Sequence, residues 1–442
     1  MNKLTKQQVF KDPLYGFIHV DYQVIKRLID SFLFQRLRRI RQLSGVQMVF
    51  HGAEHSRFSH SLGVYEIANR FLTVPDIKSA LDERKQLLFL CAALLHDIGH
   101  GAYSHAFEDV FGVDHEKIGA RLIVEDKELR SILDSIDLTF AMDVASILRK
   151  EKKYLLIEQL ISSQLDVDRL DYLERDAYFT GAAYGHIDVD RLIRVLYIRD
   201  GQVVFKLSGI HAIENYLIAR YHMYWQVYYH PVARAYEVNL EKIYLRVKDL
   251  LLQDYPFLSN VEPLKKVIEN PSDLENYIQM DDFYMNGLIA SFTRSNDPIL
   301  RKLSYDFLNR KIWKYMDQNE ENREKIEQIV SSYSDEEKRY FTSYRTVQNS
   351  TYHDSGENFG DQIFILLENG KVSPLKVQSK IIESLMLSGT KTDPKFFYQK
   401  PWDRLSLSLR EKMMHLNWSV YLINHLSLRP MEVPSILRVY PF

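Results

Sequence analysis

The segment that most constrains the fold is an uninterrupted apolar run, Leu87–Leu95, which leads directly into His96 and Asp97. Nine apolar residues are too few to span a bilayer and too many for most strands, so we expect a buried helix. This helix brings an imidazole and a carboxylate out of a dry interior, where an unpaired polar group is costly. One interpretation is a helix end capped by Asp97, with His96 satisfied by a carbonyl group. The alternative is a metal site, which other segments of the chain favour.

The composition limits the classes of partner. The chain has 442 residues, of which 46% are hydrophobic, so a sizeable core and two or three domains are expected. The formal net charge of −2 offers no basic surface for a stable nucleic-acid partner. The single cysteine, Cys91, excludes internal disulfides and suits a reducing compartment. Without a signal sequence or a long apolar segment, we expect a cytoplasmic protein that does not enter a membrane.

A second signal lies in His51–Val64, HGAEHSRFSHSLGV. If a helix begins near Ser56, Arg57 and His60 are three residues apart and share one face. Two cations would repel each other there. They are compatible if His60 is a neutral metal ligand and Arg57 holds an anion. A purely structural histidine is the alternative.

A third signal is the helical pattern of Gln164–Gly181, which is unusually acidic. Its acidic residues are Asp166, Asp168, Asp171, Glu174 and Asp176. Acids on neighbouring turns repel one another, and Asp168, Tyr172 and Asp176 fall on one face. A solvated acidic face is one interpretation. The apolar residues between the acids indicate burial instead, and buried carboxylates need a cation or a polyhydroxyl ligand.

Together these segments offer two imidazoles and two carboxylates: His60, His96, Asp97 and Asp168. Nitrogen and oxygen ligands without a thiolate suit Mn²⁺, Mg²⁺, Fe²⁺, Co²⁺ or Zn²⁺ rather than a structural zinc. Four such ligands on an octahedral ion leave two positions for water and a phosphate oxygen. Because such an ion acidifies water and offsets phosphoryl charge, the pattern predicts phosphoester hydrolysis.

The strings RFSHSLG, LLHDIGHGAYSH and DVDRLDY, in this order, resemble the HD-domain superfamily. With FQRLRRIRQL and RYHMYWQVYYHP, the chain from about Val9 to Pro231 is similar to the deoxynucleoside triphosphate triphosphohydrolases. That family includes a human enzyme that pairs an HD domain with a SAM domain. No SAM domain precedes the match, so we expect a compact bacterial-type member. The resemblance implies a mostly α-helical HD domain over 1–250. It also implies a smaller mixed α+β region over 251–442 that contributes to an oligomer and a regulatory nucleotide site.

The resemblance assigns the same four metal ligands and a set of catalytic residues. His105 matches the general acid that protonates the departing 5′ oxygen. An imidazole suits this role because its ordinary pKa is about 6.5. Asp97 helps to place the nucleophile. His100, Glu108 and His115 match a supporting acid–base relay, in which Glu108 orients an imidazole and keeps it protonated. For His115, a helix start capped by Asp114 is the alternative.

The resemblance also implies a substrate site. Arg57, Arg169 and Arg220 occupy triphosphate-binding positions, although many members carry lysine at the position of Arg169. The other matched positions are Tyr172 and Tyr228 for phosphate and sugar, Gln42 and Asp176 for the 3′ hydroxyl, and Leu43 for packing on the ribose. Tyr224 and Tyr229 stand where the human-type enzyme has His and Gln, so the base contacts stay open. Plain core packing is the alternative for these aromatic residues.

Asp30, Gln35 and Arg38 match residues that hold a guanine nucleotide at a subunit interface in regulated members. The expected activity is therefore metal-dependent hydrolysis of a dNTP to deoxynucleoside and tripolyphosphate, in a homotetramer activated by GTP or dGTP. One alternative is an HD phosphohydrolase that acts on a monophosphate, a cyclic nucleotide or an alarmone. The other is a non-catalytic nucleotide sensor or single-strand nucleic-acid binder.

Elsewhere the pattern predicts local structure only. We expect a hairpin or extended arm at Val9–Val20, one helix over 22–43, and a second hairpin in VLYIRDGQVVFK. Met280–Met316 has a helical pattern. Ser355–Gly360 and Gly389–Lys395 are predicted loops, and Gln362–Leu367 is a predicted short strand.

Overall fold

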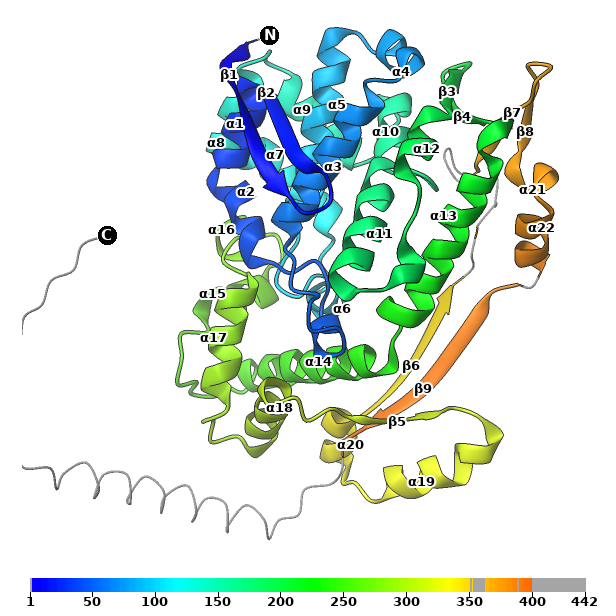
Figure 1. Cartoon of the computed structure of the whole chain (residues 1–442). Coiled ribbons are helices and arrows are strands. Elements are labelled where there is room, and N and C mark those ends of the chain that lie inside the picture. Colours follow the sequence, from blue (N-terminus) through cyan, green and yellow to red (C-terminus); the bar gives the residue numbers. More distant parts are fainter. Residues whose placement is uncertain (1, 350–351, 353–361, 388, 400–442) are drawn as a thin grey trace, which may run out of the picture. The chain divides into compact units, whose positions relative to one another are not determined.

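Helices build most of the structure, as the periodicity of the sequence predicts. The computed structural model in Figure 1 describes residues 2–349, 352, 362–387 and 389–399, apart from the side chains of His105 and Asp109. Its first half contains α1 (Gln23–Asp30), α2 (Phe32–Arg36), α3 (Arg57–Phe71), α4 (Pro75–Ala80), α5 (Glu83–Leu95), α6 (His105–Phe111), α7 (His115–Glu125), α8 (Lys127–Asp134), α9 (Phe140–Leu148), α10 (Leu155–Ile161), α11 (Val167–Thr180), α12 (Val189–Arg194), α13 (Ile210–Met223) and α14 (Pro231–Leu251). The prediction of a mostly α-helical fold with a mixed α+β C-terminal region is confirmed.

The later helices are shorter and alternate with strands. They are α15 (Glu262–Glu269), α16 (Leu274–Tyr277), α17 (Asp282–Phe292), α18 (Pro298–Leu308), α19 (Arg323–Ser331), α20 (Asp335–Phe341), α21 (Leu375–Gln378) and α22 (Lys380–Leu387).

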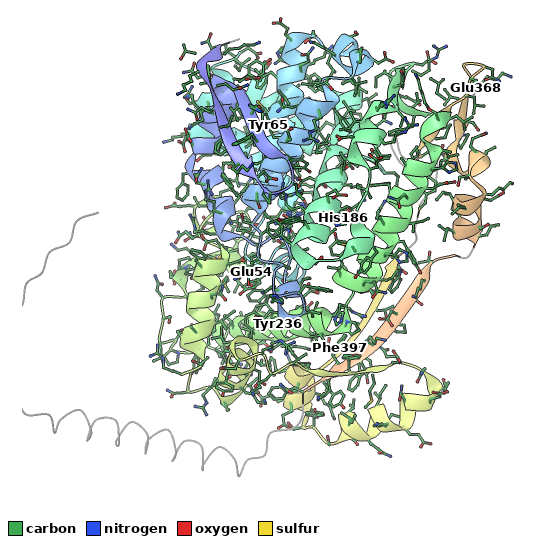
Figure 2. All side chains as sticks on the ribbon, in the orientation of Figure 1. Glu54, Tyr65, His186, Tyr236, Glu368 and Phe397 are labelled. Atoms are coloured by element: carbon green, nitrogen blue, oxygen red, sulfur yellow. The ribbon has the colours of Figure 1, made fainter. Side chains whose placement is uncertain are left out.

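The apolar run forms the central helix α5. All nine residues from Leu87 to Leu95 are buried, and α3, α9 and α10 pack against the helix. A helix covered on every side must be apolar all round, which explains why the run lacks a polar stripe. Side chains fill the space between these helices, including the buried Tyr65 of α3 (Figure 2). No helix within the described ranges is both long and apolar enough to cross a bilayer.

Strands form three small sheets in the described part of the chain. β1 (Lys3–Asp12) and β2 (Gly16–Tyr22) make the predicted N-terminal hairpin. β3 (Leu196–Arg199) and β4 (Gln202–Lys206) make the second predicted hairpin, which β7 (Phe364–Leu366) and β8 (Val372–Pro374) extend in the order β3-β4-β7-β8. The third sheet has the order β5-β9-β6, from β5 (Lys314–Asp317), β6 (Thr342–Asn349) and β9 (Lys391–Tyr398).

Three local predictions need correction. The helix expected over 22–43 is interrupted at Ser31, whose hydroxyl accepts from the Phe34 amide and starts α2. Met280–Met316, predicted to be helical, holds two helices and also the start of the strand β5. Gly389–Lys395 was expected to be a loop, yet Lys391 onward is the central strand β9. The predicted loop Ser355–Gly360 lies outside the described residues.

Residues Met1–Gln399 form one compact unit, which spans the boundary expected at residue 250. Two features connect the sequence on either side of that boundary. β4 pairs in parallel with β7, and α14 packs against both α6 and α18. The division of the chain into two regions at residue 250 therefore stays a prediction.

One buried arginine joins distant parts of this unit. The guanidinium of Arg36 in α2 is fully buried and donates to the carbonyls of His100 (2.7 Å), Ile278 (2.7 Å) and Met280 (2.8 Å). It thus ties the loop that follows α5 to the segment between α16 and α17.

Replacing Arg36 with methionine keeps most of the side-chain volume but removes the guanidinium from three carbonyls, of which that of Met280 keeps the Ala102 amide as a donor. We expect the free energy of unfolding to fall by about 3 kcal/mol, measured by urea denaturation. Arg38→Met is the matched control, because the Arg38 guanidinium is exposed, stacks on the Phe58 ring at 3.5 Å and makes one exposed hydrogen bond, to Gln35. The control should lose less than about 1 kcal/mol. Equal losses in the two variants would contradict this role for Arg36.

Candidate metal centre

Three helices bring the predicted ligands together. α3 carries His60, the end of α5 carries His96 and Asp97, and the first turn of α11 carries Asp168. The start of α11 is set by Asp166, whose carboxylate accepts from the Arg169 amide at 2.7 Å. Because α3 packs against both α5 and α11, residues more than a hundred positions apart meet at one point.

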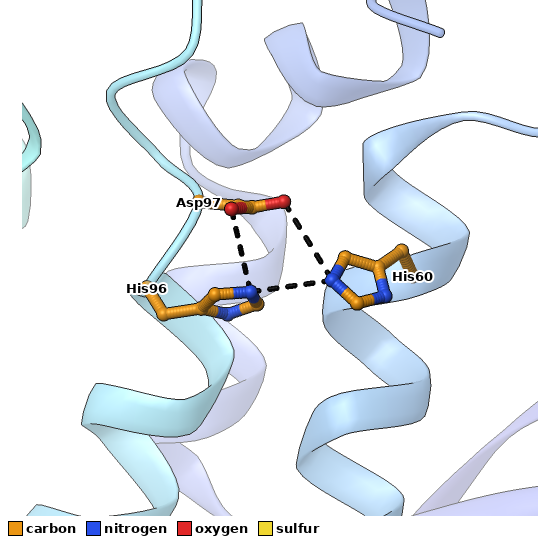
Figure 3. Close-up of side chains that lie close together, drawn as sticks. All are labelled: His60, His96 and Asp97. Carbon is orange, nitrogen blue, oxygen red and sulfur yellow. Dashed lines mark hydrogen bonds and ion pairs between the residues drawn. The ribbon is translucent and has the colours of Figure 1, made fainter. Parts of the chain in front are cut away.

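The ligand atoms form a tight cluster around the Nε2 atom of His60 (Figure 3). That atom lies 3.2 Å from Nε2 of His96, 3.1 Å from Oδ1 of Asp168 and 3.7 Å from Oδ2 of Asp97. Nε2 of His96 in turn lies 3.3 Å from Oδ1 of Asp97 and 3.6 Å from Oδ1 of Asp168. His60 and Asp97 are buried.

The second nitrogen of each imidazole indicates what the cluster can hold. Nδ1 of His60 lies 2.8 Å from Oδ2 of Asp171, and Nδ1 of His96 lies 2.9 Å from the Ala93 carbonyl. Both partners are acceptors, so each Nδ1 carries hydrogen and each Nε2 is the atom that faces the cluster, where a bound cation would replace a proton. Two imidazole nitrogens and two carboxylates facing one another fit a divalent cation. His60, His96, Asp97 and Asp168 would hold it.

The electrostatics of the cluster agree with that fit. Burial acts against protonation of His60, yet hydrogen bonds to Asp168 and Asp171 raise its pKa to about 10. Burial also opposes ionisation of Asp97, but Arg57 and His96 hold the pKa of this carboxyl well below its usual range. The carboxylates that stabilise a proton on His60 would attract a divalent cation for the same electrostatic reason.

The loop after α5 places the predicted acid–base residues beside the cluster. His100 stacks on His115 with ring centroids 3.8 Å apart, and Nε2 of His100 lies 3.3 Å from Oδ1 of Asp97. Oε1 of Glu108 lies 2.8 Å from Nδ1 of His115 and 3.4 Å from Nδ1 of His100. Burial, with Arg57 and His115 nearby, lowers the pKa of His100 to about 4, so this imidazole is neutral near pH 7. His105 begins α6, but its side chain lies outside the described part.

The same loop approaches α7 very closely. A Cβ atom on Gly99 would overlap the backbone of His115 and Gly119, so only glycine fits at this contact. α7 begins at His115, and the Asp114 carboxylate caps it by accepting from the Lys117 amide. The two interpretations of His115 therefore combine, since the residue starts a helix and also contacts Glu108.

Arg57 links the cluster to a strained turn. Its Nη1 donates to Oδ2 of Asp97 at 2.5 Å, while Nε and Nη2 donate to the Ser104 hydroxyl at 3.0 and 2.8 Å. Tyr103 and Ser104 both have positive φ, at 56° and 48°. Such strain in non-glycine residues concentrates at functional sites. Among the described residues, these contacts use three of the five N–H groups of the guanidinium, which leaves two that could bind an anion.

The other two predicted arginines lie with the aromatic residues. Nε of Arg169 donates to Asp166 at 3.1 Å, and Nη1 of Arg220 donates to Gln164 at 2.9 Å. The Arg220 guanidinium lies 5.8 Å from the Tyr224 ring, and Tyr228 is 5.1 Å from Tyr224 and 6.3 Å from Tyr172. Tyr224–Tyr228 is a π-helical turn, a feature common at functional sites.

Asp176 belongs to a polar group that the sequence identified only in part. Its carboxylate accepts from the Tyr228 hydroxyl at 2.7 Å and lies 2.7 Å from Nε2 of His55. His55 is buried and stacks on Phe179. The backbone N–H of Gln42 donates to the backbone carbonyl of His55 at 3.0 Å. Among the described residues, neither Oε1 of Gln42 nor Nδ1 of His55 has a hydrogen-bond partner, so both could accept from a ligand hydroxyl.

Sequence reasoning missed His55. Two histidines precede α3 in the string HGAEH, and nothing local distinguishes His51, which is exposed, from the buried His55. Leu43, predicted to pack on a ribose, is half-buried against the core.

The predicted regulatory residues follow one another along the chain, with Asp30 at the end of α1, Gln35 in α2 and Arg38 in the 3₁₀ turn Leu37–Arg39. Nε of Arg38 donates to Oε1 of Gln35 at 2.8 Å, and Nε2 of Gln35 donates to the Ile29 carbonyl at 2.7 Å, next to Asp30. Asp30 pairs with Lys26. A guanine nucleotide at this face stays a prediction.

Comparison with known families identifies the class. The HD domain family matches residues 57–176, and the HD associated region matches residues 187–249. The chain therefore belongs to the HD-domain family of metal-dependent phosphohydrolases.

Individual relatives extend the similarity over most of the chain. It is 41% identical over 410 residues to an uncharacterized Bacillus subtilis protein, YwfO, covering 90% of this chain and 93% of that protein. The structure is similar to that of a phosphohydrolase from Bacteroides thetaiotaomicron (TM-score 0.78, 30% identity), covering 89% of this chain and 100% of that one. A further relative is the deoxynucleoside triphosphate triphosphohydrolase SAMHD1 homolog of Dictyostelium discoideum (28% identity), covering 74% of this chain and 64% of that protein.

Removing one ligand should abolish metal binding without unfolding the chain. Saturating Mn²⁺, at about 100 times its Kd, should stabilise the native protein by about 2.7 kcal/mol, seen as a rise in Tm that a chelator reverses. Asp168→Ala should lose this rise. Asp190→Ala is the control, because Asp190 is an exposed carboxylate outside the cluster. An unchanged Mn²⁺ response in Asp168→Ala would contradict the predicted ligand set.

Proposed function

We propose that the protein hydrolyses deoxynucleoside triphosphates to the deoxynucleoside and tripolyphosphate. The observation that carries this proposal is that three arginines lie on the elements that build the metal cluster or pack against them. Arg57 donates to Asp97, Arg169 follows Asp168 on α11, and Arg220 lies on α13, which packs against α11. Three guanidinium groups match the charge of a triphosphate in a chain with no overall basic charge. The similarity to proteins named as deoxynucleoside triphosphate triphosphohydrolases supports the same substrate class.

The proposed reaction breaks the bond between the α-phosphorus and the 5′ oxygen. A divalent cation at this site supplies Lewis acidity, which acidifies water and offsets phosphoryl charge. The three arginines bind the triphosphate and neutralise charge that develops during attack. Asp97 stays ionised beside Arg57 and orients water toward the α-phosphorus. The water oxygen forms the new bond to phosphorus and its proton is released to solvent, while His105 gives a proton to the departing 5′ oxygen.

The sugar would be recognised at the group around Asp176. The ligand-accepting atoms of Gln42 and His55, together with Asp176, suit a 3′ hydroxyl. Leu43 beside the ribose would exclude a 2′ hydroxyl by its volume. Tyr224 and Tyr228 would contact the nucleotide, and the preferred base depends on the identity of Tyr224.

Chromatography of the products distinguishes this reaction from its alternatives. With Mn²⁺, each dNTP should yield deoxynucleoside and tripolyphosphate in equal amounts. Orthophosphate or pyrophosphate as the product would contradict the proposal and favour an HD phosphohydrolase of another specificity. Binding without any product would favour a nucleotide sensor.

Arginine variants then test the triphosphate contacts within the same assay. Arg220→Gln should lower kcat/KM by about 10- to 100-fold, because a charged hydrogen bond contributes about 1.5–3 kcal/mol. Arg199→Gln, on an exposed hairpin, is the control and should be unchanged.

We also propose a homotetramer in which GTP or dGTP binds at Asp30, Gln35 and Arg38 and activates turnover. Analytical ultracentrifugation should show a larger species with the activator than without it, and turnover of other dNTPs should rise. Arg38→Ala should lose both effects while keeping Mn²⁺ binding. A monomer that is equally active with and without GTP would refute this regulation.

A further inference from the structure

The turn of the N-terminal hairpin reaches the metal cluster through buried side chains. Tyr15, in the turn between β1 and β2, donates its hydroxyl hydrogen to Oδ1 of Asp171 at 2.7 Å. The other oxygen of Asp171 accepts from Nδ1 of His60 at 2.8 Å. One carboxylate in α11 therefore lies between a tyrosine near the start of the chain and a predicted metal ligand in α3.

Arg175 makes a second connection between the same turn and the same carboxylate. Its Nε and Nη2 atoms donate to Oδ2 and Oδ1 of Asp171 at 2.9 and 3.0 Å. Its Nη1 donates to Oδ2 of Asp12 at 2.9 Å. The other oxygen of Asp12 accepts from the amides of Leu14 and Tyr15 and so shapes the turn. Asp12 therefore both shapes the hairpin turn and binds Arg175.

These groups are shielded from solvent. Asp171 and Arg175 are fully buried, and Asp12 is 5% exposed. The Asp171 carboxylate accepts from Tyr15, from His60 and twice from Arg175, which uses its four lone-pair sites. Arg175 and the hydrogen bond from His60 lower the pKa of Asp171 to about 2 despite burial, which opposes ionisation. Removing any one partner therefore changes the orientation of the Asp171 carboxylate relative to Nδ1 of His60.

Gly63 makes room for this arrangement. It lies three residues after His60, on the same face of α3. A Cβ atom at Gly63 would overlap Oδ1 of Asp171 and Nη2 of Arg175. The α3 backbone and the Asp171–Arg175 pair are therefore in direct contact, which leaves His60 little freedom to turn.

We propose that Tyr15, Asp171 and Arg175 are positioning residues for His60, so that the β1–β2 turn sets the affinity of the metal centre. The turn is separated from Asp171 by 156 residues, and its role is to orient Nε2 of His60 through the hydrogen bond at Nδ1. A displacement of the hairpin changes that orientation. The inference depends on His60 being a metal ligand and not on the nature of the nucleotide.

The test is calorimetric titration of the metal-free full chain with Mn²⁺ alone. Tyr15→Phe removes only the hydroxyl and keeps the ring contacts with Arg70 and Arg175. It should weaken Mn²⁺ binding by about 3- to 10-fold, and Asp171→Asn should weaken it by about 10- to 100-fold. If Asp171→Asn fails to fold, Tyr15→Phe alone decides the outcome.

Tyr65→Phe is the matched control. Tyr65 is a buried tyrosine of α3 (Figure 2), and its hydroxyl donates to the His19 carbonyl of the same hairpin at 3.2 Å rather than to Asp171. It should bind Mn²⁺ within about twofold of the wild type. Wild-type affinity in Tyr15→Phe, or an equal loss in Tyr65→Phe, would overturn the inference.

Because the titration uses no nucleotide, its result is separate from that of the product assay. Loss of Mn²⁺ affinity in Tyr15→Phe supports the positioning role even if no dNTP is hydrolysed. Confirmed dNTP hydrolysis would not rescue the inference if Tyr15→Phe binds Mn²⁺ normally.

Discussion

Two imidazole nitrogens that present lone pairs to each other repel unless a positive charge lies between them. The fold holds Nε2 of His60 and Nε2 of His96 only 3.2 Å apart, because each Nδ1 hydrogen is bound to a fixed acceptor. The free energy that keeps this arrangement comes from burial of the surrounding helices, above all α5. A bound cation relieves this repulsion. Holding the two nitrogens close together therefore increases the affinity of the site for a metal ion.

The helices alone do not account for this preorganisation. The acceptor for His60 is Asp171, which Arg175 and Tyr15 orient in turn. The loop that carries Asp97 is tied to the C-terminal half by Arg36, and its turn is held by Arg57. Each connection joins residues far apart in sequence through a charged group that is satisfied inside the protein, where an unpaired partner would be costly. The metal centre therefore depends on the whole described unit rather than on one helical pair.

Around this centre the distribution of charge separates two tasks. Carboxylates and imidazoles form a cluster that could hold a cation, and Arg57 lies beside it with its guanidinium bound to Asp97. Gln42, His55 and Asp176 form a further buried polar group. This division agrees with membership of a phosphohydrolase family and explains how a nearly neutral chain can still suit an anionic substrate.

The sequence by itself determined the helices whose patterns are local. The apolar run defined α5, and the spacing around His60 and Asp168 defined α3 and α11, because helix formation depends on neighbours three and four residues away. Only the tertiary structure distinguished His55 from His51 and brought Tyr15 to Asp171. It also made a strand of Lys391–Tyr398, although the residues Lys-Thr-Asp-Pro at its start are typical of a loop. Pro394 is tolerated in this strand because β5 pairs with β9 only from Lys395 onward. These outcomes depend on partners more than a hundred residues away in the first two cases and on strand pairing in the last, and no local pattern encodes such partners.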